Sequence, residues 1–74
     1  MPTVARLGGI TIYLYFEDDN PPHVHVIQAE HEAKVNIRSR AVMVGHIPAR
    51  ALDRACAWIE ENEDNLLRQW DEFK

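Results

Sequence analysis

Two histidines separated by one residue are the side chains in this sequence best suited to bind a metal ion. His23 and His25 alternate with valines, as in a β-strand. Residues two apart on a strand project from the same face with Cα atoms roughly 6.5 to 7 Å apart, so both imidazoles can reach one ion. A catalytic zinc needs a third protein ligand, and Asp18 or Asp19 on the preceding segment could supply it or act as a general base. This pattern suits a small hydrolase or ribonuclease that uses zinc or manganese.

A plainer interpretation of the same two histidines is an exposed polar face that binds no metal. The residue predicted to lie opposite His25 is Lys34, whose charge disfavours a nearby divalent cation. His31 and His46 lie farther along the chain, and we expect them at the surface or in loops. The spacing alone is weak support for a metal site, so both interpretations stay open.

Apolar residues at alternate positions predict the strands that hold these histidines. The first strand is expected over residues 10–16, the second over 23–27, the third over 32–37 and a short fourth over 42–44. A turn at Ala29 and Glu30 would close a hairpin in which Val24 lies beside Val35 and Val26 beside Ala33. The sequence therefore predicts an antiparallel meander.

The same register places a mixed set of side chains on the face opposite the apolar one. It pairs His25 with Lys34 and His23 with Asn36, and it brings Tyr13 and Tyr15 to the face that carries the histidines. Since the C-terminal helices can cover only one face, we expect this one to be open for a protein or for RNA bases. The candidate binding face comprises Tyr13, Tyr15, His23, His25 and Lys34. A half-solvated sheet is the alternative.

A helical pattern begins after Ile47 and Pro48. Apolar residues recur there at intervals of three and four, and Asn62 interrupts them within an acidic run. We expect two helices, or one kinked helix. The fold predicted is α+β, a single domain over residues 1–74 in which a sheet of three or four strands (1–46) is covered on one face by the helical part (47–74). The expected core is Ile12, Leu14, Phe16, Val24, Val26, Val35, Ile37, Leu52, Ala55, Ile59 and Leu66.

Composition limits the classes of function. The 74 residues carry a net charge of −4, which does not favour nucleic-acid binding, although Lys34, Arg38 and Arg40 could form a small basic cluster with Arg6. The single cysteine, Cys56, excludes an internal disulfide and is expected to be a small core residue. No segment resembles a signal peptide or a membrane span, so we expect a cytoplasmic protein. A core this small favours a small protein partner or a homodimer.

The stretch over residues 16–26 contains the motif Phe-x-Asp-x-x-Pro-Pro-His-x-His. In this motif, and in Gly45, Pro48, Trp58 and Trp70 farther on, the chain resembles a family of small bacterial proteins, domain-of-unknown-function family 4160. The resemblance implies a short cytoplasmic protein that is often encoded beside another small protein, as in toxin–antitoxin pairs. It implies no catalytic residue and no established cofactor.

Two functions follow as hypotheses. The first is a protein-interaction module, one half of a toxin–antitoxin-like pair, which binds through the Tyr and His face or through the terminal helix. The second is the metal-dependent hydrolase or ribonuclease with His23, His25 and Asp18 as ligands. RNA binding without cleavage is a weaker third possibility.

Overall fold

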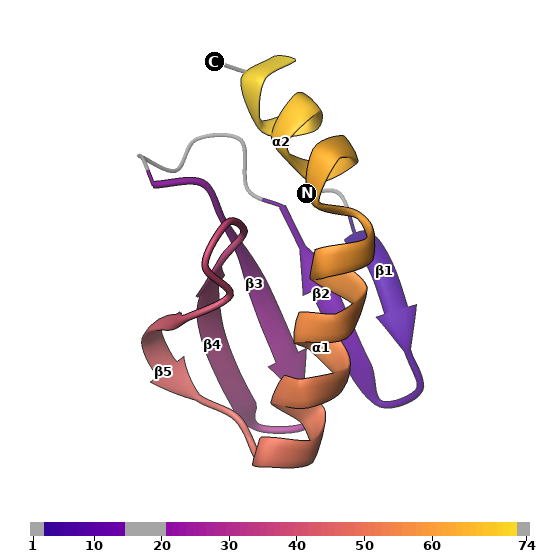
Figure 1. Cartoon of the computed structure of the whole chain (residues 1–74). Coiled ribbons are helices and arrows are strands. Elements are labelled where there is room, and N and C mark those ends of the chain that lie inside the picture. The colour runs from indigo at the N-terminus through magenta and orange to yellow at the C-terminus, as the bar shows by residue number, and fades with distance from the viewer. Residues whose placement is uncertain (1–2, 15–20, 73–74) are drawn as a thin grey trace.

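The computed structural model describes residues 3–14 and 21–72 and shows an antiparallel sheet with two helices, the first lying across one face and the second extending beyond the end of the sheet (Figure 1). The strands follow one another across the sheet in chain order. The elements are β1 (Thr3–Leu7), β2 (Ile10–Tyr13), β3 (His23–Gln28), β4 (His31–Asn36), β5 (Val42–His46), α1 (Ala49–Glu61) and α2 (Glu63–Glu72). The α+β class and the meander are confirmed, and neither helix of the described segments is long and apolar enough to cross a bilayer.

Within the part of the chain that the structure describes, the sheet has five strands, so the prediction of three or four is wrong. The additional strand is β1, which pairs with β2 through Ala5 opposite Ile12 and Leu7 opposite Ile10. Its register shifts between Thr3 and Ala5, and this irregularity interrupts the alternation that marks a strand in a sequence. Gly8, at a φ of +64°, provides the left-handed residue of the turn into β2.

The predicted pairing of the central hairpin is confirmed. Val24 lies opposite Val35 and Val26 opposite Ala33, and on the other face His25 lies opposite Lys34. In this register the hydrophobic side chains collect on the face that the helices cover. A shift of the pairing by one residue would turn all of them to the other face, so burial of the apolar face fixes the register.

The core between sheet and helices contains nearly all of the expected residues. Those that are described and buried are Ile12, Leu14, Val24, Val26, Val35, Ile37, Ala55, Ile59 and Leu66. Leu52 is only partly buried, and Phe16 lies outside the described residues. The structure adds Ile10, Ala33, Ile47, Ala51 and Trp70 to the core.

Asn62 separates the two helices, as its place in the apolar pattern suggested. Its side-chain Nδ2 donates a hydrogen bond of 2.8 Å to Trp58 O, and its backbone N–H reaches both Trp58 O and Ile59 O. Its own carbonyl accepts from Leu66 N at 2.9 Å, which begins the hydrogen bonding of α2. The break lets α2 follow a new direction beyond the sheet, and this direction brings Trp70 to the end of β3 where His23 lies.

Candidate functional site

His23 and His25, named here the histidine pair, are buried in the structure. Their exposed fractions are 4% and 7%, so the expectation that they lie on an open face is wrong. The physical reason is long-range packing. The Trp70 ring lies 5.4 Å from the His23 ring between centroids, and His25 sits in the central strand between Tyr13 on β2 and Lys34 on β4.

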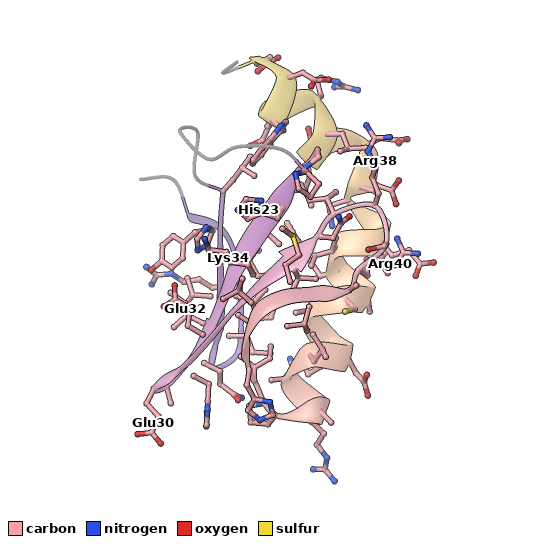
Figure 2. The ribbon with its side chains drawn as sticks, turned by 90° about the vertical axis from the view of Figure 1, so that its left-hand side faces the viewer. His23, Glu30, Glu32, Lys34, Arg38 and Arg40 are labelled. Carbon is pink, nitrogen blue, oxygen red and sulfur yellow. The ribbon has the colours of Figure 1, made fainter. Side chains whose placement is uncertain are left out.

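Both rings of the histidine pair have an oxygen atom close to Nδ1. His23 Nδ1 is 2.8 Å from the backbone oxygen of Pro21, a hydrogen bond in which the ring N–H donates. His25 Nδ1 is 3.6 Å from Glu32 Oε2, within ion-pair range. The two ring centroids are 5.4 Å apart and the planes are tilted by 44°. Figure 2 shows His23, Glu32 and Lys34 on the side of the sheet away from the helices.

The other residues predicted for a metal site are only partly placed. Asp18, Asp19 and Tyr15 lie outside the described residues. Within the described segments, no three His, Cys, Asp or Glu side chains are grouped so that they could hold a metal ion. His31 and His46 come together instead at the other end of the sheet, with ring centroids 6.1 Å apart in an edge-on arrangement.

The candidate binding face is therefore a row of cross-strand neighbours rather than an open surface. Tyr13, His25, Lys34 and Val44 follow one another on adjacent strands. The pairing of His25 with Lys34 was predicted, and the pairings with Tyr13 and Val44 are added by the structure. Tyr13 and Lys34 are half-buried and His25 is buried, so only part of the row is accessible to a partner.

The expected basic cluster does not form, because the turn between β4 and β5 folds toward the helices. Arg40 has a φ of +61°, and its Nη1 donates to Glu63 Oε1 at 3.1 Å and to Arg38 O at 3.0 Å. Glu60 lies 3.9 Å from Arg40 Nε. In Figure 2, Arg38 and Arg40 lie on the helix side and Lys34 on the opposite side of the sheet. The positive charges are therefore divided between two faces of the sheet, and the charge of Arg40 is neutralised by the carboxylates of Glu60 and Glu63.

Cys56 behaves as a structural residue. Its Sγ lies 3.6 Å from Arg40 O, which accepts a weak hydrogen bond from the thiol. Burial raises the pKa of this thiol, and the carboxylate of Asp53 raises the pKa further. A raised pKa reduces the thiolate fraction at neutral pH, which is the opposite of what a nucleophile requires.

The most unusual surface lies on β5, which forms one edge of the sheet. Val42, Met43 and Val44 are exposed by 39%, 39% and 59%, and among the described residues they are the large hydrophobic side chains that are exposed. A shallow hollow of about 280 Å³ beside them is lined by Glu32, Ala33, Lys34, Val44 and Gly45. We call Val42, Met43 and Val44, with the unpaired side of their strand, the β5 edge. The predicted meander already placed this apolar run in the last strand, and the structure confirms that it lies at an edge and is exposed.

Comparison with known proteins yields one match. No curated protein and no solved structure matches the chain. The family model described as a domain of unknown function (DUF4160) matches residues 9–71, which include the histidine pair, the β5 edge and nearly all of both helices. A match over most of the chain shows membership, so this protein belongs to the DUF4160 family.

Proposed function

We propose that this protein is an interaction module that binds an extended segment of a small protein partner along the β5 edge. The observation that carries the proposal is the exposure of Val42, Met43 and Val44 on one edge strand. An edge strand presents backbone N–H and C=O groups that a new strand can pair with, and neighbouring side chains supply specificity. Exposed apolar side chains that are gathered in one place commonly mark such surfaces.

The opposite edge of the sheet provides a contrast within the same molecule. On β1, Arg6 is exposed, and the register is irregular between Thr3 and Ala5. Charged side chains and bulges on an edge strand discourage pairing with other chains. The β5 edge also has a bulge, opposite Lys34 and Val35, but its exposed side chains are apolar rather than charged.

Charge argues for a protein partner over a nucleic acid. The chain has a net charge of −4, and Arg40 is matched by Glu60 and Glu63. Nucleic-acid binding depends on cations that can neutralise phosphates, and carboxylates already neutralise Arg40 in the turn before β5. A partner encoded beside this protein, as in a toxin–antitoxin-like pair, is the kind of partner that the family resemblance suggests.

Co-expression with the protein encoded beside this chain tests the proposal. The chain carries an affinity tag, and the complex is quantified after purification and by calorimetry. We expect Val44→Lys to weaken binding at least tenfold, because a charge at the centre of the contact must be desolvated. Ala57→Lys adds the same charge on the exposed side of α1 and should bind as the parent does.

Two outcomes would contradict the proposal. One is no complex at micromolar concentrations with the parent, and the other is equal binding by Val44→Lys and the parent. Sedimentation of the chain alone distinguishes self-association from binding of a different protein. If the parent is a homodimer and Val44→Lys is a monomer, a second copy of this chain binds the β5 edge.

The hydrolase or ribonuclease with His23, His25 and Asp18 stays a prediction. A catalytic zinc would need a third protein ligand, and the described residues do not provide one beside the histidine pair. The exposed apolar side chains of β5 support the interaction module directly, and for that reason we favour it.

A further inference from the structure

We propose that Met43 is an oxidation site that regulates binding at the β5 edge. A peroxide converts its thioether to methionine sulfoxide, and the oxidised chain binds the partner segment more weakly. This inference rests on the proposed function, because it concerns the same surface. It adds a modification site and names the chemical class of the oxidant.

Met43 lies at the centre of the exposed apolar run on the last strand of the sheet (Figure 1). The residue is exposed by 39%, so a small oxidant in solution can reach it. Val44 lies opposite Lys34 on β4. The next residue of β4, Val35, lies opposite Val42, so the pairing skips Met43. Met43 is thus the extra residue of a bulge, in the part of β5 that a new strand would cover.

Cys56 carries the other sulfur atom of the described residues, and it lies away from the β5 edge. It is half-buried on α1, where its Sγ donates a weak hydrogen bond to Arg40 O at 3.6 Å. Burial raises the pKa of this thiol and so reduces the thiolate, the form that oxidants attack. A thioether has no proton to lose, and its oxidation needs no such ionisation. We therefore expect an effect of peroxide on the β5 edge to act through Met43.

The reaction transfers one oxygen atom to sulfur. A lone pair of the Met43 thioether attacks an oxygen of hydrogen peroxide, an S–O bond forms and the O–O bond breaks. The second oxygen leaves with a proton as water, so sulfur is oxidised and the peroxide is reduced. The product is a polar, chiral side chain in place of a flexible apolar one, and sulfoxide reductases reverse the change.

The sulfoxide should alter the contact with a partner rather than the fold of the chain. At an exposed position the new oxygen is hydrated, so the free chain keeps its stability. A strand that adds along β5 covers residue 43 and removes this oxygen from water, which is unfavourable unless a hydrogen-bond donor replaces the water. We expect oxidation to weaken binding of the partner about tenfold.

A matched variant isolates the effect of Met43. The parent and Met43→Leu are treated with hydrogen peroxide, and mass spectrometry of proteolytic fragments locates the added oxygen. Calorimetry measures binding to the protein encoded beside this chain, and each chain is compared with its own untreated form. We expect the roughly tenfold loss in the parent and no change in Met43→Leu, which keeps Met1 and Cys56 and so reports oxidation elsewhere. Met43→Gln should bind as weakly as the oxidised parent without treatment, because its amide also brings an oxygen into the apolar run.

Two further measurements separate regulation from damage. The urea midpoint of the oxidised parent should equal that of the untreated parent, and methionine sulfoxide reductase should restore binding. No oxygen at Met43, equal affinity before and after its oxidation, or the same loss in Met43→Leu would overturn the inference and leave binding at the β5 edge intact. If the untreated parent forms no complex, the proposed function fails, and this inference fails with it.

Discussion

Gly45 offers the sharpest test of how β5 is held against β4. Its φ is +87°, and a Cβ built on it would collide with the backbone oxygen of Glu32, with Ala33 Cα only 3.0 Å away. Both obstacles are backbone atoms and cannot move aside as a flexible side chain would. The left-handed conformation alone costs an alanine about 1–2 kcal/mol, and displacement of the two strands raises the expected loss for Gly45→Ala to about 2–4 kcal/mol. A chain of this length is stable by only about 4–11 kcal/mol, so the effect is large.

Two other glycines provide a graded control. A Cβ at Gly8, with a φ of +64°, would meet only the flexible end of Arg54 at 3.5 Å, so Gly8→Ala should cost about 1–2 kcal/mol. Gly9 has nothing within 4 Å, and Gly9→Ala should change stability by less than about 0.5 kcal/mol in the absence of strain. Urea unfolding followed by tryptophan fluorescence measures all three. With a slope of about 1 kcal/mol per molar, Gly45→Ala should lower the midpoint by about 2 M or more. A Gly45→Ala midpoint equal to that of Gly9→Ala would refute the close packing of β5 on β4.

Two further predictions concern the turn before β5 and the thiol beneath it. Arg40→Ala should lower the free energy of unfolding by about 1 kcal/mol, because it removes the hydrogen bond to Glu63. A double-mutant cycle with Glu63→Ala, measured by urea unfolding, should give a coupling energy of about 0.5–1 kcal/mol between the two residues. Additive effects of the two substitutions would contradict the contact. Cys56 should react with iodoacetamide more slowly than a free thiol at pH 8, since burial raises its pKa. As the pH increases, the reaction rate of Cys56 should still be rising at a pH where the reaction rate of the free thiol no longer changes. Mass spectrometry follows the reaction, and a rate equal to that of the urea-unfolded chain would show that the thiol is not protected.

The pairing of β3 with β4 could be predicted because it depends on neighbours in sequence. The valines alternate on β3, and a short turn at Ala29 and Glu30 fixes which residues lie opposite each other. Ala29 has a φ of +53°, consistent with this tight turn. The break at Asn62 could also be inferred, since a polar residue interrupts an otherwise regular apolar pattern.

The environment of the histidine pair could not be predicted, because it depends on contacts between distant parts of the chain. His23 is covered by Trp70, and that contact requires the helix to change direction at Asn62. Alternation assigned both histidines correctly to one face, but it does not show whether another element reaches that face. The same limit applies to Arg40, whose positive φ and contact with Glu63 have no signal in the local sequence.

The order of the strands has a consequence for how the chain folds. Each strand pairs only with its neighbours in sequence, so the sheet can grow by successive hairpins whose loops are short. Topologies with such local pairing fold faster than those whose strands pair over long stretches of chain. Until α1 arrives, however, the growing sheet exposes its apolar face, including Val24, Val26 and Val35. We expect docking of α1 to bury this apolar face, so a substitution such as Ile59→Ala should promote aggregation during refolding more than it alters the sheet itself.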